Sequence, residues 1–226
     1  MKSLAVFVAG TALALSASAD VQTFSFTNPL QPTELINQTG ALGLFNSSLG
    51  TLTAVAFSLS GFNTQQLTLT NNGTNTQSGR AIASTFLSFG STLDPLNALL
   101  VAANPLISLS VNTGGNVTLA PNARQTFGPL SNSGSATPNV VGILTSFSSA
   151  AGGNFGIFCN SESAITIFGG GSNFGSNQVS QANCDASIQY TFTPNAPTSV
   201  PEPTSLALMG LALAGLGLMR RKADKA

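Results

Sequence analysis

The chain has 226 residues, of which only 6% are charged, against roughly a quarter in an average globular protein. It contains no His and no Trp, its formal net charge is zero, and 42% of its residues are hydrophobic, including 15 Phe. This composition can form one sizeable core or two small ones, and it excludes a disordered polyacidic or polybasic chain.

The few charges are unevenly placed. Between Asp20 and Ser199 the only cations are Arg80 and Arg124, against five acids, so this body has no basic patch and nucleic acid is disfavoured as a partner. The other cations lie near the two ends of the sequence: Lys2, Arg220, Arg221, Lys222 and Lys225. Cations confined to the ends are typical of membrane targeting.

The first 19 residues have the pattern of a secretory signal peptide. Lys2 gives a short positive region, residues 4–15 are apolar, and residues 16–19 read SASA, the small residues that a signal peptidase recognises. The apolar run is too short for a comfortable membrane span. A buried first helix is disfavoured because a hydrophilic, strand-like segment follows at once. We predict a signal helix and cleavage between Ala19 and Asp20.

Residues 20–194 predict an all-β domain. Apolar and polar residues alternate with period two in several segments, with Asn- and Gly-rich turn signals between them at 71–73, 112–116, 132–135 and 169–173. We expect seven to ten short strands in a single antiparallel β-sandwich of jelly-roll type, with a hairpin around residues 113–115. No long amphipathic helix is expected.

The start and end of this body resemble the choice-of-anchor E domain family. Residues 23–61 contain FNSSLGTL at 45–52, where that family has FDPSLGTL before a long strand, and YTFTP at 190–194 resembles its closing strand. Asn46 stands where the family has Asp. The resemblance implies a β-rich extracellular domain, with no known enzymatic activity or ligand.

Cys159 and Cys184 are the only cysteines. An even number in an exported protein predicts one disulfide between them, with two buried free thiols as the alternative. A catalytic Cys would need a His to activate it, and the chain has none.

Catalysis is disfavoured by what the body lacks. Without His or Lys in it, Ser-His-Asp and Ser-Lys sites are excluded, and zinc would have to use the two cysteines. A carboxylate pair for glycoside hydrolysis would have to come from four scattered acids: Glu34, Asp94, Glu162 and Asp185. Asp94 or Asp185 with nearby Asn residues could hold a structural calcium, but no loop has the charge density for it. We expect no enzyme, metal or cofactor.

A carbohydrate-binding role is the main alternative to a structural one. Sugars stack on Trp or Tyr, and Tyr190 is the only such residue. The Phe residues mostly occupy core-facing positions of the predicted strands. N-x-S/T sites occur at Asn37, Asn46, Asn72 and Asn116. They are expected by chance in so Asn-rich a chain, so glycosylation is not predicted.

After a short linker (195–199), the tail has three parts in order. Pro201 and Pro203 hold Glu202 in an extended segment. Residues 206–219 carry no charge and would make a helix of about 21 Å, short of a bilayer core of about 30 Å unless residues 204–205 and snorkelling cations extend it. A buried amphipathic helix is disfavoured because the run is apolar on every face. We predict a transmembrane helix with a basic stop.

The tail as a whole, residues 200–223, resembles a PEP-CTERM sorting signal. The residues that carry the resemblance are Val200, Pro201, Glu202 and Pro203, the apolar run, and the basic stop Arg220, Arg221 and Lys222. It implies an exosortase-type enzyme as partner, transient anchoring in the inner membrane, and a final place at the surface or in the extracellular matrix of a Gram-negative bacterium. We therefore expect a non-catalytic structural protein that contacts exopolysaccharide, with a carbohydrate-binding or adhesin-like module as the alternative.

Overall fold

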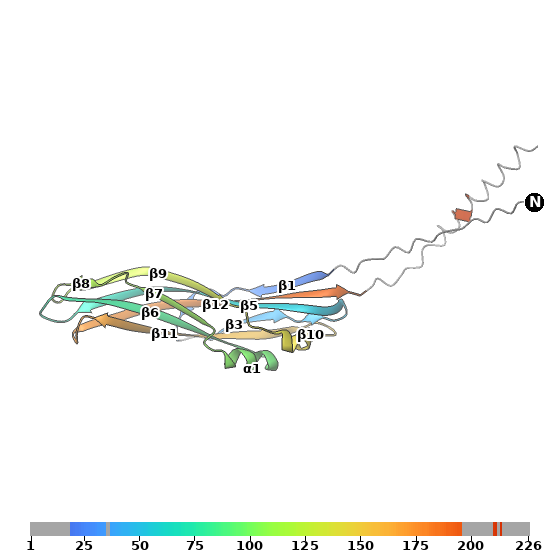
Figure 1. Cartoon of the computed structure of the whole chain (residues 1–226), viewed down its shortest axis with the longest axis horizontal. Coiled ribbons are helices and arrows are strands. Elements are labelled where there is room, and N and C mark those ends of the chain that lie inside the picture. The colour runs from blue at the N-terminus through green and yellow to red at the C-terminus, as the bar shows by residue number, and fades with distance from the viewer. Residues whose placement is uncertain (1–18, 35–36, 196–209, 212, 214–226) are drawn as a thin grey trace, which may run out of the picture.

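The computed structural model describes residues 19–34, 37–195, 210, 211 and 213. Two antiparallel β-sheets lie face to face in an elongated body (Figure 1), so the predicted all-β antiparallel fold is confirmed. The sorting motif and basic stop, and the predicted signal peptide apart from Ala19, lie outside the described residues. Gly210, Leu211 and Leu213 of the predicted membrane helix are described and are helical. Among the described residues, no helix is long and apolar enough to cross a membrane.

Sheet A has the strand order β1-β12-β5-β9, with the short β2 also pairing with β12. Sheet B has the order β3-β11-β6-β7, with β8 also pairing with β6. A small parallel pair joins β4 and β10. The bounds are β1 (Asp20–Phe26), β2 (Gln31–Pro32), β3 (Gln38–Gly43), β4 (Phe45–Asn46), β5 (Gly50–Asn71), β6 (Gln77–Ser91), α1 (Asp94–Ala102), β7 (Ile107–Asn112), β8 (Val117–Leu119), β9 (Arg124–Ala136), the 3₁₀ helix η1 (Val141–Phe147), β10 (Ser148–Ser149), β11 (Asn154–Gly169) and β12 (Phe174–Pro194).

The central strands are much longer than predicted. β5 has 22 residues and β12 has 21, whereas we expected short strands separated by frequent turns. The alternating segments at 53–61 and 66–70 belong to one strand, because the polar stretch between them keeps the same alternation, with Asn63 and Gln65 pointing inward. At about 3.3 Å per residue, β5 spans about 70 Å.

The predicted turn at residues 132–135 is wrong, because these residues lie inside β9 and pair with β5. Gly134 is needed for packing between the sheets and does not form a turn. A Cβ on Gly134 would come within 3.0 Å of the side chains of Ile107 and Leu109 on sheet B. The glycine therefore lets the two sheets approach each other at this edge.

The predicted hairpin around residues 113–115 is also wrong. β7 and β8 do not pair with each other; both pair antiparallel with β6, one after the other along it. The backbone N–H of Thr113 donates to the Ala81 carbonyl, and the backbone N–H of Ala81 donates to the Thr113 hydroxyl. These two bonds hold the start of the segment between β7 and β8 against β6. Residues 113–116 are therefore an interruption of one edge strand, because β6 is long enough to hold both segments.

Both ends of the body lie at the same end of the rod, which we call the base. Asp20 pairs with Phe192, so the first and last strands run side by side there (Figure 1). The opposite end, the tip, is formed by the turns that follow β5 and β11, at residues 72–76 and 170–173. A chain leaving Pro194 therefore departs from the end farthest from the tip.

The interior is divided along its length. A large apolar cluster fills the base half and includes Leu59 and Leu87, and two smaller clusters lie toward the tip. Between them a fully buried polar layer joins the sheets, because the amides of Asn63 and Gln65 both donate to the hydroxyl of Thr85, at 3.0 and 2.7 Å. Asn63 also accepts the backbone N–H of Asn132, whereas the buried Oε1 of Gln65 has no hydrogen-bond partner in the part of the chain that the structure describes, so the cost of burying this layer is only partly offset.

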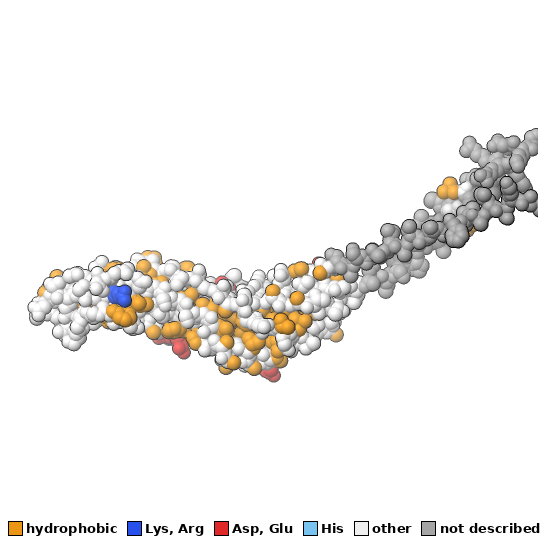
Figure 2. All heavy atoms as spheres, viewed as in Figure 1, with side chains coloured by type: hydrophobic (Ala, Val, Ile, Leu, Met, Phe, Trp, Pro, Cys, Tyr) orange, Lys and Arg blue, Asp and Glu red, His pale blue; other side chains and the backbone are white. Residues whose placement is uncertain are grey.

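The short helix α1 was not expected from the sequence. Pro95 occupies its first turn, a position that proline favours because the missing N–H is not needed there. Leu96 and Leu100 are fully buried in the base cluster. Figure 2 shows hydrophobic side chains gathered over the half of this face that carries α1, while charged side chains are few.

Candidate functional site

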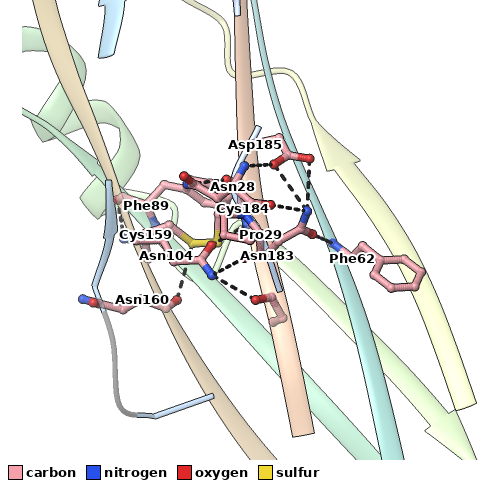
Figure 3. The surroundings of a disulfide bond; sticks show 12 residues. Asn28, Pro29, Phe62, Phe89, Asn104, Cys159, Asn160, Asn183, Cys184 and Asp185 are labelled. Atoms are coloured by element: carbon pink, nitrogen blue, oxygen red, sulfur yellow. Dashed lines mark hydrogen bonds between the residues drawn. A yellow bond between two sulfur atoms is a disulfide. The ribbon is translucent and has the colours of Figure 1, made fainter. Parts of the chain in front are cut away.

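The predicted disulfide is confirmed and joins the two sheets. Cys159 lies on β11 and Cys184 on β12, with the Cα atoms 6.3 Å apart (Figure 3). Both residues are almost completely buried. Because the bond connects a strand of sheet B to a strand of sheet A, it holds the sandwich closed at the edge where the N-terminal strands lie.

Gln38 reinforces the same edge next to the disulfide. Its side-chain amide donates to the Ala182 carbonyl at 2.9 Å, and its carbonyl oxygen accepts from the backbone N–H of Cys184 at 2.7 Å. Gln38 begins β3 of sheet B, and both partners lie on β12 of sheet A. A single buried side chain thus bridges the sheets by two hydrogen bonds, a role for which no local pattern around Gln38 provides a signal.

The chain crosses between the sheets just before Gln38. Thr33 donates its N–H to Ser180 on β12, and Glu34 donates its N–H to Ser161 on β11. The Glu34 carboxylate also accepts the backbone N–H and hydroxyl of Ser163, at 3.1 and 2.7 Å. The Glu34 side chain thus provides a hydrogen-bond acceptor for a backbone N–H of β11 that has no partner strand. The backbone of Glu34 itself is in the left-handed region, with a φ of 71°.

The four acids considered for catalysis lie on different elements. Glu34 precedes β3, Asp94 begins α1, Glu162 is exposed on β11 and Asp185 lies on β12. Glu34 is hydrogen-bonded to both neighbours of Glu162 in the sequence, Ser161 and Ser163, so Glu34 and Glu162 lie close together along one edge of sheet B. In the part of the chain that the structure describes, no group of three or more His, Cys, Asp or Glu could hold a metal ion.

Asp185 is the acid with the most defined surroundings. Its Oδ1 accepts the backbone N–H of Asn28 at 2.9 Å, and the Asn183 amide lies 3.4 Å from both carboxylate oxygens (Figure 3). Asn28 in turn bonds to the Cys184 carbonyl and receives a bond from Asn183. The loop after β1 therefore fixes the orientation of this carboxylate on the outer face of sheet A.

Tyr190, the one residue weighed as a sugar-stacking platform, is unavailable for that role. It is fully buried in the base cluster, and its hydroxyl donates to the Gly43 carbonyl at 2.7 Å. Phe24 and Phe45 pack against its ring. Burial raises the pKa of its phenol well above the ordinary value.

The segment that carries the choice-of-anchor resemblance lies at the base. The side-chain Oδ1 of Asn46 accepts the backbone N–H of Ser48 at 3.0 Å, a bonding pattern that Asn and Asp share in turns. Asn195 donates from its backbone to Leu49 and from its side chain to Ser48. This segment therefore holds the residue from which the chain leaves toward the tail.

The N-x-S/T asparagines are all at least partly accessible. Asn37, Asn72 and Asn116 are exposed, and Asn46 is half-buried.

Residues 199–222 match the model of the PEP-CTERM protein-sorting motif. This motif supports export and exosortase-dependent sorting to the cell surface of a Gram-negative bacterium. No curated protein matches the chain.

Among solved structures, the chain is similar to an infectious bursal disease virus structure (Gt strain) at 13% identity and a TM-score of 0.19, covering 92% of this chain. It spans only about half of that viral chain, 52%. The match to Desmodium yellow mottle tymovirus has 8% identity and a TM-score of 0.23, covering 88% of this chain and 98% of the viral one. TM-scores this low support no inference.

Proposed function

We propose that this chain is an exported, non-catalytic structural protein of the cell surface or exopolysaccharide matrix. The observation that carries the proposal is the sorting motif at residues 199–222, which follows directly after a rod-like sandwich whose last strand ends at Pro194. A signal peptide over residues 1–19 would start the export that the motif completes. A membrane helix in the tail would hold the protein transiently in the inner membrane until exosortase acts.

The geometry of the body suits this route. Because Asp20 and Phe192 pair at the base, the tip would stand about 70 Å from the anchor, by the length of β5. The base segment at residues 45–52 binds Asn195, where the tail departs. This arrangement supports our assignment of the body to the choice-of-anchor E type.

The free edge near the tip supports a structural role. Beyond Cys159, β11 has no partner strand on its outer side, and β12 has none before Gln181, among the strands described. The unpaired part of β11 carries Glu162, and the Glu34 carboxylate bonds to Ser163 beside it. Nearer the tip, residues 164–169 and 174–179 carry no charged residue. Edge strands are usually protected from pairing by charges or proline. Their absence here favours association between copies in a matrix.

The experiment that tests the proposal is cell fractionation combined with intact-mass analysis of the mature protein. We expect it in the surface or matrix fraction, beginning at Asp20, shortened within the tail, and two mass units lighter than the fully reduced form because one disulfide removes two hydrogens. Recovery of the full-length chain from the cytoplasm would refute the proposal.

The second candidate is a carbohydrate-binding module. It is favoured by one observation, a groove on the outer face of sheet A that is lined by Phe62 and Asp185 among other residues.

A further inference from the structure

The outer face of sheet A has a shallow groove of about 440 Å³ at mid-length. It is lined by Ser60, Gly61, Phe62, Ser133, Gly134, Ser135 and Asp185. These residues come from β5, β9 and β12, three neighbouring strands. The groove therefore lies on hydrogen-bonded strands of the sheet rather than on a loop.

Phe62 is the unusual residue in this groove. It is 36% exposed, although most of the Phe residues are buried or half-buried. Its position on β5 points outward by the strand alternation, and its direct neighbours across the sheet are Ser133 on one side and Asn183 on the other. An aromatic ring surrounded by small polar side chains on a rigid surface offers a flat apolar face to a ligand.

Hydrogen-bonding groups lie in the next outward row. Ser60 pairs with Ser135 on one side and with Asp185 on the other, about 7 Å along the strands from Phe62. The Asp185 carboxylate is held by Asn28 and Asn183. Its Oδ2 has only one long contact, at 3.4 Å, so this oxygen retains acceptor capacity toward the groove.

We propose that this groove binds one pyranose unit of an uncharged polysaccharide. The C–H groups of one sugar face would lie against the Phe62 ring, and adjacent hydroxyls would donate to Asp185 and exchange hydrogen bonds with the two serines. This inference does not depend on the sorting route, because binding is a property of the folded body.

The charge of the body selects an uncharged sugar over an acidic one. Between Asp20 and Ser199 there are only two cations. Arg124 pairs with Thr70 on β5, eight residues and about 27 Å from the groove, and Arg80 belongs to β6 of sheet B. With Asp185 in the groove, a uronate or sulfate would meet a negative charge and no compensating cation.

The test is titration calorimetry on the full chain in mild detergent, with hexasaccharides of β1,4-glucan, α1,4-glucan and β1,4-mannan, and hexagalacturonate as the acidic probe. We expect a Kd on the order of 1 mM for at least one uncharged probe and no binding of hexagalacturonate. Phe62→Ala should weaken binding about tenfold or more, and Asp185→Asn about fivefold, since a hydrogen bond to a charged acceptor becomes a neutral one. Phe62→Tyr should retain binding.

Phe168→Ala is the matched control, because Phe168 is also exposed, at 44%, but lies on sheet B away from the groove. It should leave binding unchanged. If thermal melting shows that Phe62→Ala does not fold, Phe62→Leu replaces it in the test, because leucine keeps apolar volume at this position without an aromatic ring. The proposal is overturned if no uncharged hexasaccharide binds, if hexagalacturonate binds as well as they do, or if folded ring-less variants bind like the wild type.

Discussion

At the scale of single residues, the stability of the body depends on one disulfide and one buried glutamine, which join the two sheets where β11 of one sheet lies over β12 of the other. Cys159, Cys184 and Gln38 connect the sheets within one small region. All three residues are buried, so the Gln38 hydrogen bonds cannot be replaced by bonds to water, and the disulfide is not reached by solvent, unless the sandwich opens. Single substitutions here should cost more than most substitutions on the surface.

Removing the disulfide should lower stability substantially. The two cysteines are 25 residues apart in sequence, and closing such a loop contributes about 3 kcal/mol in the chain-entropy model. We expect the Cys159→Ala, Cys184→Ala double variant to lose about that much in urea denaturation. Each single variant should lose about as much, since it breaks the same cross-link and the remaining buried thiol packs as a small hydrophobic group. An unchanged midpoint would show that the bond adds nothing to the folded state.

Gln38→Ala should cost about 1–3 kcal/mol, because it leaves the Cys184 N–H and the Ala182 carbonyl without partners in a buried region. Gln189→Ala is the control: Gln189 lies on β12 and its side chain is exposed, so its loss should change stability by less than about 0.5 kcal/mol. Equal effects of the two substitutions in urea denaturation would contradict the bridging role.

Tyr190 makes stability fall at high pH. Burial raises the pKa of its phenol in the folded protein, while in the unfolded chain it stays near 10. Below pH 10 both states keep the proton, and above it only the unfolded state releases one, so unfolding becomes easier as pH rises. The chain has one Tyr and no Trp, so absorbance at 295 nm reports this group alone. We expect no phenolate signal at pH 11 unless the protein unfolds.

At the scale of elements, glycines determine how closely the sheets approach. Gly61 on β5 is buried, and a Cβ there would collide with the Leu87 side chain of sheet B. Gly134 on the neighbouring strand is directly opposite Gly61 and faces Ile107 and Leu109. Small residues at this paired position let side chains from sheet B fill the space between the sheets.

Gly61→Ala should therefore destabilise the protein by about 1–3 kcal/mol through overpacking. The matched control is Gly115→Ala, because Gly115 lies in the excursion between β7 and β8 and a Cβ there would meet nothing within 4 Å. That variant should be neutral within about 0.5 kcal/mol. Thermal melting of both variants checks this, and a neutral Gly61→Ala would mean that Leu87 moves aside at little cost.

At the scale of the whole molecule, the rod and its tail have separate tasks. The strands described end at Pro194, and the sorting motif begins at residue 199. The two regions are joined by a short linker that starts at Asn195, which is tied to the base. Changes in the motif should therefore affect location without affecting the fold of the rod.

Replacing Pro201, Glu202 and Pro203 with Ala should keep the protein in the inner membrane with its tail uncleaved. The change lets helix extend upstream and removes the one charge in the recognition segment. Pro197→Ala with Thr198→Ala, in the linker, is the control and should be sorted normally. Fractionation and intact mass measure both. Surface delivery of the triple-Ala variant at wild-type efficiency would refute exosortase-type recognition and leave a plain anchor.

Truncation after Ser199 should release a soluble, folded body, because no described strand lies beyond Pro194. The released fragment should melt within about 2 °C of the full chain, since the rod keeps all its pairings. Circular dichroism of the secreted fragment tests this. A fragment that is unfolded or aggregates would show that the tail contributes to the stability of the rod.

The class of the fold, the disulfide and the sorting signal could all be predicted from the sequence alone. Successive side chains of a strand point to opposite faces of the sheet, so apolar and polar residues alternate along it. This alternation is visible within a single segment such as residues 188–192. Two cysteines allow only one intramolecular pairing, and the tail motif is contiguous. These features are local, or have only one solution, so they can be predicted without knowing how the chain packs.

The remaining features depend on how the chain packs in three dimensions. Glycine in 132–135 and 113–115 looked like turn chemistry, but Gly134 serves packing between sheets, and 113–116 interrupts an edge strand. Tyr190, the only residue of a type that commonly stacks on sugars, is buried, whereas Phe62, which nothing in the sequence singled out, is exposed. Which face of a strand is covered, and which strands become neighbours, depends on contacts between residues far apart in the chain, and alternation alone carries no information about either.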